Sequence, residues 1–422
     1  MKKQLSKLSE NLQDLINKIH EMAVSKKVKA YLVGGFVRDL ILKVNNLDLD
    51  IVIDGDGAKF AEAFAKHMGA RITVHKNFGT ATVFIGQGSK VDFSSSRKEI
   101  YPKPGQLPVV SAGSLRVDLF RRDFTINAMA IDLRYGKLFD YFGGRADLEG
   151  KKIRIMHPLS FIDDPTRILR AIRFEQRFGF VIEPKTLKLL KDAVKLDMLS
   201  KVHAHRIRDD LILILKEKDP IKEIRRLQKL VGFDFIAKGI KLNSKSYAFL
   251  KSLKREINWF NRNYPKRRAI DSWLIYLMGL LDSLDDKEIK SVCLRLGLRK
   301  GEEIRLLSFK QISHAALNDL SRVAVKPSHI FEILEPLSYE TILALKAKYN
   351  NPVFKAHIES FLEIYNGMRI FISGDDLHGL GVVPGPRYQK IFAQVLSAKL
   401  NGLVRTKSEE LVLIKRLLRK RS

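Results

Sequence analysis

The chain has 422 residues, of which 76 are Lys or Arg and 47 are Asp or Glu, so its formal net charge is +29 at pH 7. An excess of this size indicates a polyanionic partner, either nucleic acid or an acidic membrane surface. The single cysteine, Cys293, excludes an internal disulfide and a cysteine-rich metal site, and it fits a reducing cytoplasm. No long apolar run occurs, so we expect no membrane-spanning helix, and the N-terminal segment lacks the apolar stretch of a signal peptide.

Up to about residue 155, short β-rich runs alternate with helical patterns. Strands are predicted at 31–35, 48–54, 71–76, 80–85 and 90–94, and helices at 36–44 and 57–68. From about Pro158 the strand signals fade, and helical periodicity dominates segments such as 166–178, 272–284 and 409–420. We therefore predict an α+β fold: a small N-terminal α/β head with a mixed sheet, followed by an all-helical remainder.

The first chemical motif, GGFVRDLILKVNNLDLD, occupies residues 34–50. Asp48 and Asp50 are two apart on a predicted strand, so both side chains leave the same face. Carboxylates held side by side repel each other unless a cation lies between them, and such hard oxygen ligands suit Mg²⁺. A D-x-D pair alone is a common surface pattern. Behind a GG-x-V-R-D turn, it predicts a metal site that activates a hydroxyl and neutralises a transferring phosphate.

Three features near this pair suit a phosphate ligand or a further metal ligand. Gly34 and Gly35 let the backbone approach a phosphate closely, and the helix that follows offers free N–H donors. Arg38, one turn into that helix, is placed to reach the same phosphates. Asp92, in the run KVDFSSSR, is a candidate third carboxylate, although a plain surface-strand role fits it equally well.

The second motif, DLFRRDFTINAMAID (118–132), mixes charges beside an apolar run. Arg121 and Arg122, next to Asp118 and Asp123, would position a triphosphate and a ribose hydroxyl. The alternative is a solvated loop whose surface ion pairs contribute little.

The third motif, FIDDPTRILRAIRFEQRFGF (161–180), reads as a capped helix. Asp164 has the character of an N-cap, and Pro165 suits the first helical position. A basic stripe follows at three- or four-residue steps, formed by Arg167, Arg170, Arg173 and Arg177. For an isolated helix, a solvated basic face would be the favoured reading.

In their order and spacing, GGFVRDLILKVNNLDLDIVI, DLFRRDFTINAMAID, YFGGRADL and DDPTRILRAIRF resemble the class II tRNA nucleotidyltransferases. These are the bacterial and eukaryotic CCA-adding enzymes, with their CC-adding, A-adding and bacterial poly(A) polymerase relatives. The resemblance covers roughly residues 30–180; the remaining chain matches only in being helical and basic. It implies four parts: a catalytic head (1–157), a neck that recognises the base (158–222), a body (223–345) and a tRNA-binding tail (346–422).

The resemblance also implies roles for individual residues. Asp48 and Asp50 would bind Mg²⁺ in a two-metal reaction, with Asp92 as the candidate third carboxylate. The nucleotide would be held by Gly34, Gly35, Arg38, Arg122, Asp164, Arg167, Arg170 and Arg173, of which Asp164 and Arg167 would read the base. The family usually has Glu-Asp before the proline, whereas this chain has Asp163–Asp164, so Asp163 is left out of the site.

The base-reading role has a physical rationale. Asp164 accepts hydrogen bonds, Arg167 donates them, and a spacing of three residues at a helix start puts them on one side. Cytosine and adenine both present an amino donor beside a ring-nitrogen acceptor, whereas uracil and guanine present a carbonyl beside a ring N–H. One Asp–Arg pair therefore accepts C and A without a nucleic-acid template, and a mismatched base costs about 1–3 kcal/mol.

The helical half is expected to hold the tRNA. Segment 254–268 combines six basic residues with Trp259, Phe260 and Tyr264, which suits a phosphate backbone and a stacking surface, although we favour a core role for Trp259. A Gly/Pro turn into a helix at 379–392 and a basic tail at 415–422 are further candidates. The implied partners are the 3′ end and acceptor/T-arm region of tRNA, with CTP and ATP as substrates in the cytoplasm; the oligomeric state is not predicted.

Several alternatives share these motifs. A bacterial poly(A) polymerase, or a CC-only or A-only tRNA enzyme, would have the same head and neck. The segment YPKPGQLP (101–108), in the region that the resemblance ties to C-to-A switching, is neither deleted nor of the usual form, so the choice between C and A stays open. A non-catalytic RNA-binding relative would have lost a carboxylate, yet both are present. A small-molecule nucleotidyltransferase would need neither the basic helical half nor the DDxxR pair.

Overall fold

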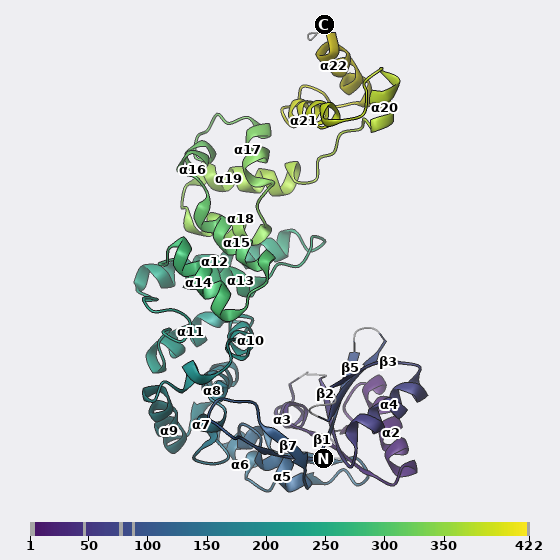
Figure 1. The fold of residues 1–422 in the computed structure, drawn as a ribbon, viewed down its shortest axis with the longest axis vertical. Helices are drawn as coiled ribbons and strands as arrows, with labels where there is room; N and C mark the ends of the chain where they lie inside the picture. The colour runs from purple at the N-terminus through teal and green to yellow at the C-terminus, as the bar shows by residue number, and fades with distance from the viewer. Residues whose placement is uncertain (1–4, 45–47, 76–78, 87–88, 420–422) are drawn as a thin grey trace. The chain divides into compact units, whose positions relative to one another are not determined.

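The computed structural model describes residues 5–44, 48–75, 79–86 and 89–419, and it divides the chain into two compact units, Met1–Phe235 and Ile236–Ser422. Strands occur in the first unit, whereas the described part of the second is built from helices (Figure 1). The α+β prediction is therefore confirmed, and the finer division into four parts stays a prediction. None of the helices in the described ranges combines the length and apolar composition that crossing a membrane would require.

A seven-stranded mixed sheet forms the centre of the first unit, in the order β3-β4-β5-β2-β1-β8-β9. Its strands are β1 (Lys29–Val33), β2 (Leu49–Asp54), β3 (Arg71–His75), β4 (Thr80–Ile85), β5 (Ser89–Ser95), β8 (Ala130–Asp132) and β9 (Leu138–Phe139). β2 and β5 run parallel, and every other neighbouring pair is antiparallel. The parallel register sets Asp50 opposite Asp92.

Helices cover both faces of this sheet. On one side lie α2 (Glu10–Ser25) and α4 (Gly57–Met68), and α4 packs Phe60 and Phe64 against Phe93 of β5 (Figure 1). On the other side α5 (Leu115–Phe120) joins a core that includes Tyr31 and Val33. Because residues alternate along a strand, each face has its own apolar set.

The glycine turn after β1 differs from its prediction. The strand expected at 31–35 spans Lys29–Val33, and α3 (Gly35–Leu42) begins directly after Gly34. Gly34 has φ +66°, a left-handed conformation that ends the strand and that glycine adopts without strain. Helix α3 ends before the predicted Val44, because Lys43 is itself left-handed. Lys76, the predicted end of the third strand, and residues 420–422 of the basic tail lie outside the described residues.

The rest of the first unit combines a hairpin, short elements and a set of helices. The elements are β6 (Arg97–Ile100), β7 (Val109–Ala112), η2 (Thr125–Asn127), α6 (Gly144–Glu149), β10 (Lys152–Ile153), α7 (Ser160–Asp163), α8 (Thr166–Phe178), β11 (Val181–Ile182), α9 (Pro184–Lys195), η3 (Met198–Lys201), α10 (Ala204–Leu215) and α11 (Pro220–Leu230). The β6–β7 hairpin and the β10–β11 pair were not predicted. The prediction of an all-helical neck is wrong at β11, which is a strand. It was missed because a strand of two residues is too short to show the alternation of a strand in the sequence.

The second unit is helical throughout its described residues. Its elements are α12 (Ser244–Asn263), α13 (Ser272–Leu280), α14 (Asp286–Leu296), α15 (Lys300–Gln311), α16 (His314–Leu320), α17 (Pro327–Leu334), α18 (Tyr339–Lys348), α19 (Pro352–Ser360), η4 (Phe361–Tyr365), α20 (Gly374–Gly379), α21 (Pro386–Leu400) and α22 (Lys407–Arg419). Helix α13 is buried on all sides except at Ser272, and α20–α22 share a core around Leu377, Val395 and Ile414.

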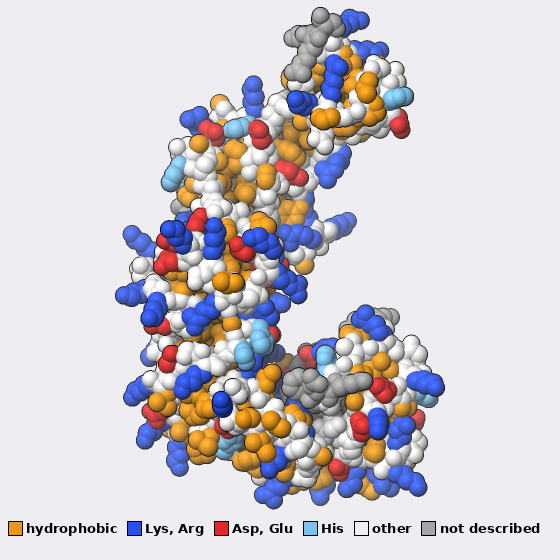
Figure 2. All heavy atoms as spheres, viewed as in Figure 1, with side chains coloured by type: hydrophobic (Ala, Val, Ile, Leu, Met, Phe, Trp, Pro, Cys, Tyr) orange, Lys and Arg blue, Asp and Glu red, His pale blue; other side chains and the backbone are white. Residues whose placement is uncertain are grey.

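Lys and Arg side chains are scattered over the visible surface of both units (Figure 2). In the predicted RNA-binding segment 254–268, two of the basic residues are bonded to other helices of the unit, the half-buried Arg267 and the exposed Arg268. Arg267 donates to Tyr339 Oη (2.8 Å) and to the carbonyl of Leu362 (2.6 Å), and Arg268 pairs with the buried Glu340 (2.8 Å). The Trp259 ring is half-buried against the Lys346 ammonium, 3.2 Å from the ring centroid. Trp259 therefore packs against a neighbouring helix, but it is not one of the buried core residues that we predicted it to be.

Candidate active site

A cavity of about 700 Å³ in the first unit gathers the predicted site residues except Asp92. Of those residues, it is lined by Gly34, Gly35, Arg38, Asp48, Asp50, Arg122, Asp164, Arg167, Arg170 and Arg173. They come from three motifs that are far apart in the sequence. Asp92 lines a neighbouring cavity of about 310 Å³, which Asp50 and Arg122 also border.

The carboxylates at the edge of this cavity differ in their surroundings. Asp92 is engaged at both oxygens, by Thr82 Oγ1 (2.5 Å) and Lys90 Nζ (2.9 Å). Burial, together with the charges of Asp92 and Asp48, raises the pKa of Asp50 to about 6 against the opposing effect of Arg122. A cation beside Asp50 would offset the free-energy cost of burying its ionised carboxylate.

A divalent metal fits this donor set only together with a substrate. Among the described residues, no group of three or more His, Cys, Asp or Glu side chains converges on one point. Mg²⁺ commonly takes one or two carboxylates and completes its shell with waters and substrate phosphates. Asp48 and Asp50 are therefore suited to a metal that arrives with a nucleotide, rather than to a closed protein cage.

The backbone at Gly34 lies against Arg122. A Cβ at Gly34 would lie 2.7 Å from Arg122 Nη1 and 3.6 Å from Asp50 Oδ2, so a side chain there would intrude on both. Arg122 donates to Asp118 Oδ2 (3.1 Å), and its buried Nε has no hydrogen-bond partner among the described residues. It is Nη1, and not the buried Nε, that lies beside the glycine turn and is placed to meet an anion there.

Arg38 forms part of the cavity wall. Its Nε and Nη2 donate to the Asp39 carboxylate (2.7 and 2.9 Å), and its Nη1 donates to Asn127 Oδ1 (2.6 Å). The guanidinium also lies over Phe178, 4.8 Å from the ring centroid. All three nitrogens have protein acceptors, so phosphate contact by Arg38 would compete with or add to these bonds.

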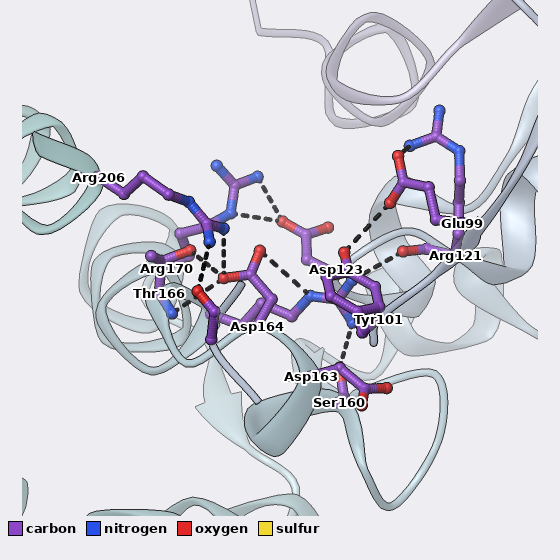
Figure 3. Close-up of polar contacts among 12 residues, drawn as sticks. Glu99, Tyr101, Arg121, Asp123, Ser160, Asp163, Asp164, Thr166, Arg170 and Arg206 are labelled. Carbon is purple, nitrogen blue, oxygen red and sulfur yellow. Dashed lines mark hydrogen bonds and ion pairs between the residues drawn. The ribbon is translucent and has the colours of Figure 1, made fainter. Parts of the chain in front are cut away.

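Arg170 is held by a buried carboxylate. Two of its nitrogens donate to Asp123 Oδ2 (2.9 and 2.5 Å), as the dashed lines of Figure 3 show. Burial opposes ionisation of Asp123, yet Arg170 and Asn127 together lower the pKa of Asp123 to about 2. The pair is therefore charged at neutral pH and joins the second motif to helix α8.

The candidate base-reading pair has a defined geometry. Asp164 Oδ1 accepts from the Thr166 backbone N–H (3.2 Å), Thr166 Oγ1 (2.7 Å) and Arg206 Nη2 (2.7 Å). Asp164 Oδ2 lies 4.0 Å from Arg167 Nε, so an acceptor and a donor stand side by side at the cavity. Helix α8 begins at Thr166, one residue later than predicted, and its N-cap residue is Pro165, so the prediction of Asp164 as the N-cap is wrong. Asp164 Oδ1 nevertheless accepts from the N–H of Thr166, the first helical residue.

Arg167 is oriented by two further acceptors. Its Nη1 donates to Ser160 Oγ (2.5 Å) and its Nη2 to the carbonyl of Arg121 (2.8 Å). Arg173 is buried at the same cavity; its Nη1 lies 3.5 Å from Glu217, and its Nε has no partner among the described residues. Arg167, Arg170 and Arg173 of the basic stripe on α8 are thus held at the cavity, whereas Arg177 is exposed.

Several cavity residues were missed by sequence reasoning. They are Glu99, Tyr101, Asn127, Thr166, Phe174, Arg206, Asp209 and Asp210. Burial raises the pKa of Asp210 to about 6, against the opposing charges of Arg170 and Arg173. No local signal marks these residues, because most of them reach the cavity from elements outside the motifs.

Charge is balanced among the residues that line this cavity. Seven arginines face seven carboxylates there, although the whole chain carries +29. The cavity thus has ordered donors and acceptors, but no net positive charge of its own.

Comparison with known proteins agrees with the motifs. Residues 30–154 match the poly A polymerase head domain. The A-adding tRNA nucleotidyltransferase of Halalkalibacterium halodurans is 32% identical over 429 residues, which cover 96% of this chain and 95% of that protein. The A-adding enzyme of Geobacter sulfurreducens is 39% identical over 399 residues, or 93% of this chain. The chain spans only 45% of the length of that second relative.

A solved structure shows the same architecture. The Thermotoga maritima CCA-adding enzyme complexed with tRNA_CCA superposes with a TM-score of 0.73 at 33% identity, covering 99% of this chain and 98% of that one. The fold is that of a nucleotidyltransferase head with helical extensions. The chain belongs to the tRNA nucleotidyltransferase family, which confirms the resemblance seen in its motifs.

Proposed function

We propose that this chain transfers C, A or both from CTP or ATP to the 3′ end of tRNA, with release of diphosphate. One observation carries the proposal: a single cavity joins the carboxylate pair Asp48 and Asp50 to the side-by-side acceptor and donor of Asp164 and Arg167. The cavity can therefore accommodate both nucleotidyl transfer and base selection. Both relatives compared above are named A-adding enzymes, which favours addition of the terminal A.

In this proposal Asp48 and Asp50 hold the divalent metal, which we take to be Mg²⁺. When bound, Mg²⁺ activates the tRNA 3′ hydroxyl and neutralises charge on the transferring phosphate. Arg122, whose Nη1 lies beside the Gly34 turn, would donate to the triphosphate there. The raised pKa of Asp50, about 6, leaves this carboxylate ionised at neutral pH and ready to bind a cation.

Base selection follows from Asp164 and Arg167. Asp164 Oδ2 would accept the exocyclic amino group of C or A, and Arg167 would donate to the neighbouring ring nitrogen. Asp164 Oδ1 is already occupied by three donors, so only one oxygen faces the base. Uracil and guanine would place a carbonyl oxygen against the acceptor Asp164 Oδ2. Each such mismatch costs about 1–3 kcal/mol of binding free energy.

The proposed polymeric substrate is tRNA, bound through its acceptor/T-arm region. The related Thermotoga enzyme was solved with tRNA_CCA, and the chain's charge of +29 suits a phosphate backbone. Since the active cavity is charge-balanced, the excess lies elsewhere on the molecule and is available to the RNA.

The test uses three tRNAs, ending before the first C, before the second C and before the terminal A, each incubated with labelled CTP or ATP and Mg²⁺. Extension of only the CC-ending tRNA by one A identifies an A-adding enzyme, and growth of all three to CCA identifies a complete CCA-adding enzyme. Repeated A addition identifies a poly(A) polymerase. No incorporation into any of them, with tRNA binding retained, would refute the proposal in favour of a non-catalytic RNA-binding protein. Asp48→Ala and Asp50→Ala are the inactive controls.

A further inference from the structure

Arg206 belongs to none of the sequence motifs, yet it lies in the wall of the candidate active site. It comes from the first turn of α10 and borders the same cavity as Asp164. Its side chain is 17% exposed, and that of Asp164 is 16% exposed, so both are largely withdrawn from water.

Arg206 makes two hydrogen bonds with different partners. Nη2 donates to Asp164 Oδ1 (2.7 Å), and Nη1 donates to the backbone carbonyl of Gly105 (3.2 Å). The first bond is visible in Figure 3, where Arg206 reaches across to the start of α8. A planar guanidinium presents these two donors in a fixed geometry, so the position of Asp164 is linked to that of Gly105.

Gly105 lies in the segment 101–108, between strands β6 and β7. Its N–H donates to the carbonyl of Asp163 (3.3 Å), and its φ is +73°. A Cβ at Gly105 would lie 2.9 Å from the Lys201 carbonyl oxygen, so segment 101–108 packs directly against the backbone at Lys201.

The start of the segment is linked to the other base-reading residue. Tyr101 Oη donates to Glu99 Oε2 (3.1 Å), and Glu99 Oε1 accepts from Arg121 (2.8 Å). The carbonyl of the same Arg121 accepts from Arg167 Nη2 (2.8 Å). Segment 101–108 is therefore connected to Arg167 at its start and to Asp164 at its middle.

We propose that Arg206 is a positioning residue for base selection, which fixes the Asp164 carboxylate and couples it to segment 101–108 through Gly105. The proposal rests on the base-reading role of Asp164 proposed above. Arg206 keeps Oδ1 turned away from the base and leaves Oδ2 beside Arg167. Without Arg206, Oδ1 loses its charged donor and the Asp164 carboxylate can turn. Oδ2, the acceptor for the base, is then no longer fixed beside Arg167.

The first experiment compares Arg206→Met, Arg206→Lys and the matched control Arg145→Met. Arg145 is an exposed arginine on α6 that pairs with Glu149 outside the cavity. The measured quantity is kcat/KM for each of the four nucleotides on the tRNA end that the wild type extends. Loss of a charge-assisted bond predicts that Arg206→Met lowers the preference for C or A over U and G roughly 5- to 30-fold. Arg206→Lys should lower it less, because an ammonium does not present the guanidinium's fixed pair of donors.

The second experiment tests the coupling with a double-mutant cycle of Arg206→Met and Gly105→Ala. If Arg206 acts through Gly105, the two changes in nucleotide preference combine to less than their product. A multiplicative combination would overturn the coupling.

Other outcomes separate this proposal from the proposed function. An unchanged preference in Arg206→Met and Arg206→Lys, with all nucleotides slowed equally, would overturn the positioning role and leave base reading intact. A wild type that does not discriminate among the nucleotides would remove the base-reading role on which the inference rests. If Arg206→Met does not fold, Arg206→Lys provides the same comparison.

Discussion

In the proposed function the two oxygens of Asp164 would have separate tasks, one bonded to the protein and one to the base, and the substitution Asp164→Asn tests this division. All groups around Oδ1 are donors, namely the Thr166 N–H, Thr166 Oγ1 and Arg206 Nη2. The amide oxygen of Asn will therefore keep the Oδ1 position, and its NH₂ group will take the place of Oδ2. An acceptor that matches the amino group of C and A becomes a donor that matches the carbonyl of U and G.

The expected magnitude follows from the contact that is reversed. A two-bond contact of this kind is worth about 1–3 kcal/mol, so the ratio of kcat/KM for CTP or ATP over UTP or GTP should fall roughly 5- to 150-fold. The bond from the Thr166 N–H at the start of α8 survives, since the amide oxygen of Asn also accepts. Asp164→Ala should lose that bond as well, and with it about 1 kcal/mol of stability.

The assay is a set of kcat/KM values for the four nucleotides, with thermal melting of each variant. Asp56→Asn is the matched control, because Asp56 caps α4 through the Lys59 N–H and lies outside the cavity. It should leave the nucleotide preference unchanged. The reasoning is refuted if Asp164→Asn slows all four nucleotides equally, since Asp164 would then only position α8.

Three further predictions concern the metal site, a buried carboxyl and the RNA surface. Asp50→Ala should reduce transfer roughly 100-fold or more while filter binding of tRNA persists; near-normal turnover would exclude it as a metal ligand. Burial raises the pKa of Glu223 from 4.5 to about 7, so its contribution to stability is lost as pH rises through 7. Glu223→Gln should therefore raise the melting temperature at pH 8 but not at pH 4, and an equal gain at both would contradict this. Removing the exposed Arg262 and Lys266 should weaken tRNA binding and flatten its salt dependence without lowering stability. Arg267→Ala should lower the melting temperature instead, and the reverse pattern would place Arg267 on the RNA surface.

The parts of the fold that could be predicted are those determined by neighbouring residues. Helix α4 begins and ends where predicted, because the Asp56 cap and Gly69 both lie at its ends in the sequence. Asp48 and Asp50 could be paired because a two-residue spacing on a strand puts both on one face. The motif residues line one cavity because the starts of β2, α3 and α8 meet there.

The parts that could not be predicted depend on contacts between distant residues. Arg206 binds a carboxylate 42 residues away and a carbonyl 101 residues away, so no local pattern distinguishes it from other arginines of the chain. Arg267 looked like an RNA contact beside aromatics, but its partners lie 72 to 99 residues further along. In both cases the basic side chain was evident and its partner was not.

The charge balance of the cavity explains how a strongly basic chain can be selective for a base. A cavity with excess positive charge would attract any nucleotide triphosphate and would favour all four bases equally, since the triphosphate is common to them. Here each arginine of the base-reading region has a fixed acceptor, as Arg170 has Asp123 and Arg167 has Ser160. In the proposed function, a metal held by Asp48 and Asp50 would supply the charge that offsets the triphosphate. Donors that are already oriented lose little conformational freedom when a matching base binds, and they cannot turn to suit a mismatched base. In the proposed function, base selection therefore comes from the rigid hydrogen-bond network and not from electrostatic attraction of the triphosphate.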